Sequence, residues 1–253
     1  MKSNHRGGLQ SRFKNHCVRL LLATLITLSL AAMALAQADG AGGSPELKEK
    51  VAALKQSAAE NQQKLHQYQW TEMQQVALKG ETKSQTESMC QYGPDGKVQK
   101  TPMGPPPEQP SGGRMKQKMI AKKKEEMQDY MGDVKTLLAS YVPPNPQKIQ
   151  AAFQAGKASI SPDKSAGLVN LVFKDYAQPG DQMTIAFNSA AKKIAGLNVN
   201  TYMGQAKDAV TLTVSFSSLP DGTNYAEKTA LNAAAKQLVV TTTNTNYRKL
   251  GGM

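Results

Sequence analysis

The sequence predicts an α+β fold in which long antiparallel strands are interrupted by helices. Three observations lead to this prediction. Apolar residues at helical spacing precede a long strand with a period of two, and a methionine-rich helical pattern follows a stretch of prolines and glycines. Beyond residue 156, apolar and polar residues alternate with a period of two between turn signals, which is typical of an antiparallel meander.

The first 36 residues have the layout of a secretory signal. A basic stretch is followed by the apolar run 20–33 and by Ala34-Leu35-Ala36, a small-x-small cleavage site. The apolar run is short of the roughly 20 residues that a membrane-spanning helix needs. We therefore expect cleavage after Ala36 and export to the periplasm. Cys17 lacks the small apolar context of a lipoprotein signal, so we do not expect a lipid anchor.

The exported chain, residues 37–253, is long enough for a single α+β domain with a sizeable core. The first helix is predicted to begin at Ser44-Pro45-Glu46, where a hydroxyl cap is followed by a proline and an acid. The prolines after residue 142 stop the second helical pattern. The predicted order is an N-terminal helix (44–67), a β-hairpin region (68–102), a Pro/Gly-rich linker (103–113), a helical insertion (114–155) and an antiparallel β-meander (156–253).

The β-hairpin region begins with a strand that is apolar on one side. Tyr68, Trp70, Val76 and Leu78 share one parity, so in an extended strand they share one face. The return strand is much more polar, which predicts that its faces are partly wet. At the other end of the chain, the threonine-rich stretch "VVTTTNTNY" predicts either an exposed edge strand or a strand with one face toward water.

Few chemistries are available to the exported chain, and we expect no cofactor, no metal site and no enzyme. His66 and Cys90 are its only histidine and cysteine, which argues against nucleophilic triads, zinc sites and an intramolecular disulfide. We expect Cys90 to be a buried apolar residue; if it is exposed, it could bridge two molecules. Glu72 shares the parity of Trp70, and partial solvent exposure is its simpler interpretation. A hydrolase with paired carboxylates is the third-ranked alternative, and it would need a second acid beside Glu72.

Basic residues bear on possible partners. Removal of the signal would lower the formal charge from +12 to +7, and the remaining charge favours anionic envelope surfaces over nucleic acid. In "RMKQKMIAKKKEEMQDY" the lysines are balanced by nearby acids, so a solvated helix face is the favoured interpretation. Peripheral contact with a membrane through this basic helix is the alternative.

The layout resembles that of the outer-membrane lipoprotein-sorting carriers and the related periplasmic stress-sensor regulators. The resemblance rests on the helix leading into "YQWTE", the hairpin through "YGPDGK" and the "FNSAAKKI" turn. The stretches "YGPDGKVQKTP" and "LPDGTNYAEKTAL" also look like those of uncharacterised exported bacterial proteins. The resemblance implies a half-barrel: a curved, unclosed antiparallel β-sheet wrapped around helices, with an apolar concavity that receives acyl chains.

Two functional hypotheses follow. The first is a binding protein that holds a lipid, an acylated peptide or another apolar envelope ligand between the sheet and the methionine-bearing helix. The second is an interaction or stress-sensing module with a filled core that binds an envelope protein. For the first we expect eight lining residues, chosen by position alone: Trp70, Leu78, Met127, Met131, Phe173, Ile185, Phe187 and Phe216. The sequence leaves the oligomeric state open.

Overall fold

The computed structural model describes residues 56, 59–104 and 114–251 of the chain. They fall into two compact units: residues 114–139, which hold a long helix, and the remainder, which holds the sheet. The predicted signal, the linker and most of the predicted first helix lie outside the described residues, although 59–65 are helical. The strands are β1 (Tyr68–Leu78), β2 (Glu81–Tyr92), β3 (Val98–Met103), β4 (Ala158–Asp163), β5 (Leu168–Lys174), β6 (Gln182–Asn188), β7 (Lys193–Tyr202), β8 (Ala209–Ser218), β9 (Asn224–Ala233) and β10 (Leu238–Lys249). The helices are α3 (Arg114–Leu138), α4 (Pro146–Gln154) and the short 3₁₀ helix η1 (Ala234–Lys236).

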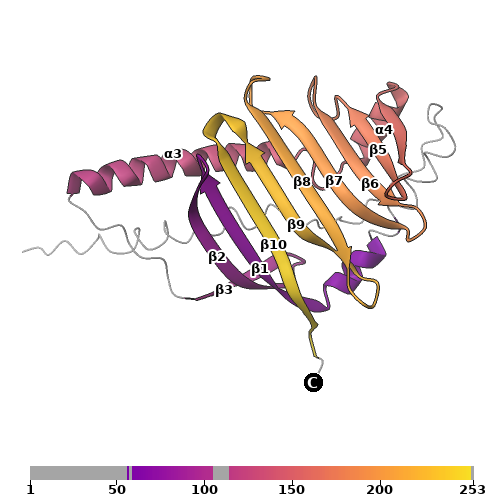
Figure 1. The fold of residues 1–253 in the computed structure, drawn as a ribbon, viewed down its shortest axis with the longest axis horizontal. Coiled ribbons are helices and arrows are strands. Elements are labelled where there is room, and N and C mark those ends of the chain that lie inside the picture. Colours follow the sequence, from indigo (N-terminus) through magenta and orange to yellow (C-terminus); the bar gives the residue numbers. More distant parts are fainter. Residues whose placement is uncertain (1–55, 57–58, 105–113, 252–253) are drawn as a thin grey trace, which may run out of the picture. The chain divides into compact units, whose positions relative to one another are not determined.

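All ten strands form one antiparallel sheet that does not close, which confirms the predicted α+β, half-barrel-like class. The order across the sheet is β3-β2-β1-β10-β9-β8-β7-β6-β5-β4, and the ribbon is visibly curved (Figure 1). The two edge strands each contain a proline, Pro102 in β3 and Pro162 in β4. Proline cannot donate to a neighbouring strand, so it is tolerated at an edge and discourages further pairing there.

The turn between β1 and β2 consists of Lys79 and Gly80, which have φ angles of 54° and 80°. Positive φ at both central residues is the geometry of a type I′ turn, whose twist matches that of the flanking strands. The turn therefore sets the pairing of β1 with its polar partner. Of the twelve residues of β2, Cys90 alone is buried. This agrees with the prediction that the faces of this strand are partly exposed to water.

The sheet has an inner face, which carries Trp70 and Ile185, and an outer face opposite to it. Burial alternates along the strands, most regularly in β6, where Met183, Ile185 and Phe187 are buried and their neighbours are not. The register shifts by one residue at four places, in the β1–β10, β1–β2, β6–β7 and β8–β9 pairs. Such bulges bend and twist the strands, which accounts for part of the curvature.

Helix α4 belongs to the same unit as the sheet and contacts β4 and β5. The side chain of Asn145 caps it by accepting hydrogen bonds from the backbone N–H groups of residues 147 and 148. Its Phe153 ring meets Phe173 of the inner face edge-on, with centroids 5.8 Å apart. The helix therefore covers the inner face at the β4 end.

Helix α3 makes up the described part of the other unit. Met131, Val134 and Leu138 are buried at helical spacing, whereas Met119 is 63% exposed, so the methionine stripe is buried only toward the C-terminal end. Helix α3 ends at Leu138, before the prolines that were predicted to stop it. Across the described residues, no helix is both long and apolar enough to cross a membrane.

Strand β10 is not an edge strand, so that alternative for the threonine-rich stretch is wrong. It lies between β1 and β9 in the middle of the sheet. Thr242 and Asn244 on its inner face are buried, whereas Val239 and Thr245 on its outer face are exposed. The other alternative, one face toward water, describes β10 correctly.

Candidate functional site

One row of paired residues on the inner face changes from apolar to polar across the sheet, whereas the next row is apolar throughout and contains Phe173, Met183, Val199, Leu212, Leu231 and Val240. We call the first of these rows the cross-strand row. From β4 to β8 it contains Ile160, Leu171, Ile185, Leu197 and Val214, and from β9 to β1 it continues with Thr229, Thr242 and Gln74. The four apolar members on β5 to β8 are between 1% and 4% exposed. Five apolar side chains are thus followed by two hydroxyls and an amide.

Six of the eight residues predicted to line a site lie on the inner face. Phe173, Ile185 and Phe187 are at most 2% exposed, and Trp70 is 6% exposed. Leu78 and Phe216 are half-buried. The remaining two lie on α3 in the other unit, where Met127 is half-buried and Met131 is buried.

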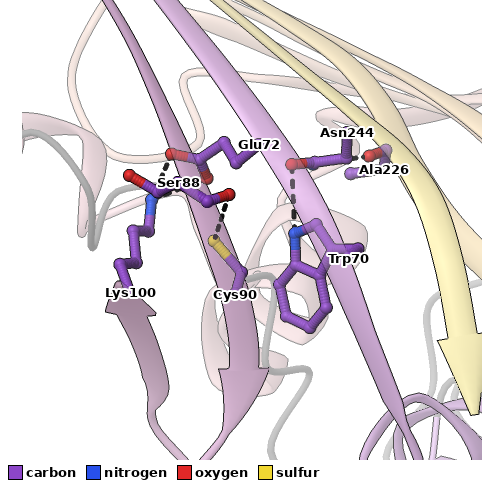
Figure 2. Close-up of polar contacts among 7 residues, drawn as sticks. All are labelled: Trp70, Glu72, Ser88, Cys90, Lys100, Ala226 and Asn244. Carbon is purple, nitrogen blue, oxygen red and sulfur yellow. Dashed lines mark hydrogen bonds and ion pairs between the residues drawn. The ribbon is translucent and has the colours of Figure 1, made fainter. Parts of the chain in front are cut away.

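A buried ion pair joins β1 to β3 across β2 on this face. Lys100 Nζ lies 2.5 and 2.6 Å from the two carboxylate oxygens of Glu72 (Figure 2). The two side chains are only 14% and 10% exposed, so the expected partial solvent exposure of Glu72 is wrong. The paired-acid hypothesis requires a second acid at Glu72, and the structure places a lysine there. In the described part of the chain, no group of three or more His, Cys, Asp or Glu residues could hold a metal ion.

Trp70 lies beside the ion pair and is fixed by a buried polar chain. Its Nε1–H donates to Asn244 Oδ1 at 3.2 Å, and Asn244 Nδ2 donates to the carbonyl of Ala226 at 2.8 Å (Figure 2). This chain connects three neighbouring strands, β1, β10 and β9. It satisfies both the indole N–H and the buried amide, and it holds the indole ring in one orientation.

A bulge in β10 completes the surroundings of Trp70. Asn246 has a φ of 55°, and the register shift places two β10 residues opposite one β1 residue. The extra residue turns Tyr247 to the inner face, where its ring stacks on Trp70 at 5.5 Å and 10°. The Tyr92 ring also contacts the indole, tilted by 49° with the ring centroids 5.5 Å apart. Burial raises the pKa of Tyr92 to about 12, so its hydroxyl stays protonated at any physiological pH.

Cys90 is fully buried on β2, which confirms the prediction of a small buried residue. Burial, followed by the negative charge of Glu72, raises the pKa of its thiol to about 12. Its thiol donates a hydrogen bond to the carbonyl of Ser88, at 3.8 Å (Figure 2). A protonated and inaccessible thiol is neither a nucleophile nor a bridge to a second molecule.

Two threonines of the cross-strand row have unsatisfied hydroxyls. Thr229 and Thr242 are directly paired across β9 and β10, and each is 1% exposed. Neither hydroxyl has a hydrogen-bond partner among the residues that the structure describes. Directly opposed side chains lie close enough to interact, yet these two do not bond to each other. Buried polar groups are nearly always paired, so this row contains an exception.

A second buried polar cluster shapes the loop between β5 and β6. Asp181 accepts hydrogen bonds from the Tyr141 hydroxyl at 2.5 Å and from the backbone N–H groups of residues 176–178. The Tyr141 hydroxyl is also 2.7 Å from that of Thr201. These bonds hold Tyr141 in the loop after α3 and explain why the residue is not helical. All acceptors are engaged within the fold, so we assign this cluster a structural role.

Sequence reasoning missed four residues of the inner face: Lys100, Thr229, Thr242 and Asn244. The parity of Val98 and Lys100 in β3 could have placed Lys100 on one face. No local signal indicates that β10 pairs with β1, and this pairing brings the amide of Asn244 to Trp70. Threonine in a strand is ordinary, so nothing in the sequence distinguishes the two unsatisfied hydroxyls.

Comparison with known proteins adds little to this description. The sequence matches no protein-family model, and no curated protein matches it either. Among solved structures, the chain is similar to a DUF1329 family protein from Desulfovibrio piger ATCC 29098, with 9% identity and a TM-score of 0.39. The similarity covers 80% of this chain and 94% of that one.

Proposed function

We propose that the protein is an exported, non-enzymatic binding protein that holds a lipid, an acylated peptide or another apolar envelope ligand on the inner face of its sheet. The observation that carries the proposal is the continuous apolar surface of β5 to β8, which includes the cross-strand row from Leu171 to Val214. An apolar sheet face needs a second apolar layer against it. Within the sheet's own unit, α4 supplies that layer at β4 and β5.

Membership in the half-barrel group of lipoprotein-sorting carriers and stress-sensor regulators is part of the same proposal. It is supported by the curved, unclosed antiparallel sheet and by helices inserted between β3 and β4. Export is likewise a proposal, which rests on the layout of residues 1–36. It requires that the protein recovered from the periplasm begins at Gln37, as measured by intact mass or N-terminal sequencing.

Ligand binding is tested by native mass spectrometry of the protein purified gently from its own envelope, followed by lipid extraction. Titration with the apolar fluorophore N-phenyl-1-naphthylamine measures binding of an apolar ligand to the inner face directly. Phe216→Asp puts a charge on the inner face at a half-buried position, and Ser217→Asp puts the same charge on the outer face as a control. We expect Phe216→Asp to weaken fluorophore binding by at least about tenfold, because burying a charge against an apolar ligand is costly, and Ser217→Asp to leave it unchanged. A clean apo mass together with no fluorophore binding would refute the proposal.

A second candidate function, binding of an envelope protein, is favoured by the outer face of β1 to β3. Met73, Met89 and Met103 are each 42% exposed there. By register, Met73 and Met103 flank Glu87, and Met89 lies two residues along from it on β2. Exposed methionines form adaptable contact surfaces. Replacing all three by glutamine would abolish a photo-crosslink from position 87 to an envelope protein if this candidate is correct, and would leave fluorophore binding intact.

A further inference from the structure

The first half of helix α3 contributes little to a core. No side chain of residues 118–126 is buried, and Met119 among them is 63% exposed. From residue 118 on, burial begins at Met131 and continues at Val134 and Leu138. A helix of a globular protein usually buries an apolar stripe along its length. Because this stripe is covered toward one end, residues 118–126 are open to a partner outside the chain.

Charge is segregated along α3. Residues 114–124 contain six basic residues and no acid, whereas residues 125–138 contain four acids and one lysine. No acid occupies the first turn, although the helix dipole favours negative charge there. Lys118 and the lysines 122–124 form no ion pair with any residue that the structure describes, the adjacent acids included. An anionic partner would supply the counter-charge that these lysines lack within the described fold.

The position of Met119 indicates which kind of anionic partner fits. At about 100° per residue, Lys122 and Lys123 lie about 60° and 40° to either side of Met119 around the helix axis. An exposed apolar side chain therefore lies between two exposed lysines. This arrangement fits a membrane surface, where an apolar side chain enters the boundary between head groups and acyl chains while lysines reach the phosphates. A nucleic acid would bind the lysines but offer the methionine no apolar layer.

We propose that the exposed half of α3 binds an anionic lipid surface. Lys118 and the lysines 122–124 contact lipid phosphates, and Met119 inserts at the level where the acyl chains begin. The attachment is peripheral and reversible by salt, because salt screens charges at an exposed surface. It uses none of the inner-face residues of the sheet, so it can fail while the proposed ligand binding stands, and the reverse.

Vesicle co-sedimentation tests the proposal with the protein purified from its own envelope. The vesicles consist of phosphatidylcholine alone or of phosphatidylcholine with about 30% phosphatidylglycerol, which supplies the anionic surface. At low salt the wild type should bind the anionic vesicles at least about tenfold more tightly than the neutral ones, because each lysine at such a surface contributes about fivefold. Salt at about 1 M, where the Debye length is about 3 Å, should remove the preference.

Two variants separate the contributions of charge and insertion. K122Q/K123Q should lose at least about tenfold in affinity for the anionic vesicles. M119Q keeps every charge and should lose at least about threefold, because the apolar side chain no longer leaves water. All three positions are exposed, so both variants should melt at the wild-type temperature.

Matched controls are taken from the sheet unit. K164Q/K207Q removes the same charge from two exposed lysines in the loops before β5 and β8. M73Q replaces a methionine that is 42% exposed on the outer face. Each control should bind the anionic vesicles within about twofold of the wild type, since neither changes α3.

Four outcomes overturn the proposal. Equal binding to the two kinds of vesicle is one, and binding of K122Q/K123Q as tight as that of K164Q/K207Q is another. An unchanged affinity of M119Q is the third, because the lysines would then act without insertion into the lipid. The fourth is tighter binding to double-stranded DNA than to the anionic vesicles at the same salt, which would favour a nucleic-acid partner. Fluorophore binding by the inner face is measured separately and is unaffected by any of them.

Discussion

Replacing Lys100 by methionine tests whether the ion pair with Glu72 is as well shielded from water as the burial of its two side chains indicates. Methionine keeps the apolar stem of the side chain but removes the positive charge, so the Glu72 carboxylate is left without its partner. Removal of one partner from a buried pair costs about 3–5 kcal/mol. Because the two side chains retain 14% and 10% of their exposure, we expect the lower end of that range, about 3 kcal/mol.

Urea denaturation measures this loss as a shift of the midpoint at constant slope. For a domain of this size, about 3 kcal/mol corresponds to a fall in Tm of roughly 6–12 °C. The double variant Glu72→Met, Lys100→Met removes both charges and should recover the free energy of unfolding to within about 1 kcal/mol of the wild type, because apolar replacements of a buried pair are often neutral or stabilising. The double-mutant cycle then gives a large coupling energy between the two sites.

The neighbouring hairpin supplies a matched control. Lys97 and Asp95 also form an ion pair, but they are 3.8 Å apart and 83% and 57% exposed. Lys97→Met should change the free energy of unfolding by less than about 0.5 kcal/mol. If Lys100→Met costs no more than Lys97→Met, the pair is solvated in solution, and the reasoning from burial fails.

Three further predictions concern other buried or shielded groups. Tyr141→Phe removes the hydroxyl that donates to Asp181, and should lower the free energy of unfolding by about 1.5–3 kcal/mol in urea titrations, the usual value for a hydrogen bond to a charged group. The hydrogen bond from Tyr68 holds the pKa of Asp221 well below its usual range. Its stabilising contribution is therefore present above the unfolded pKa of about 3.9 and is lost as the pH falls further; Asp221→Asn should reduce the acid-induced loss of stability in thermal melts below pH 4. Cys90, whose pKa is raised to about 12, should resist thiol reagents at pH 8 in the folded protein and react fully in urea.

Each of these predictions has a contrary outcome. A Tyr141→Phe variant as stable as the wild type would mean that water replaces the lost hydroxyl. If the Asp221→Asn variant loses as much stability below pH 4 as the wild type, other carboxylates cause the acid-induced loss. Rapid labelling of Cys90 at low denaturant would show that the end of the sheet formed by β1 to β3 opens locally.

Local patterns in the sequence predicted several features of the sheet unit. The common parity of Trp70 and Leu78 predicted the buried face of β1, and the polar residues after Gly80 predicted a mostly exposed β2. Burial alternates in β6 as its period of two requires. These predictions succeed because side-chain direction in a strand depends only on the position along that strand. The prolines of β3 and β4 carried a further signal, since each occupies an edge strand.

The arrangement of the inner face was decided by the tertiary structure. Asn244 reaches Trp70 because β10 pairs with β1, although the two residues are 174 positions apart. Lys100 neutralises Glu72 across an intervening strand, and the bulge at Asn246 turns Tyr247 onto the indole. Pairings over such separations depend on burial and register across the whole sheet, and no window of the sequence contains both partners. The sequence by itself therefore determined which residues lie on the inner face of β1 and of the meander strands, and the pairing of β1 with β10 decided which polar groups meet there.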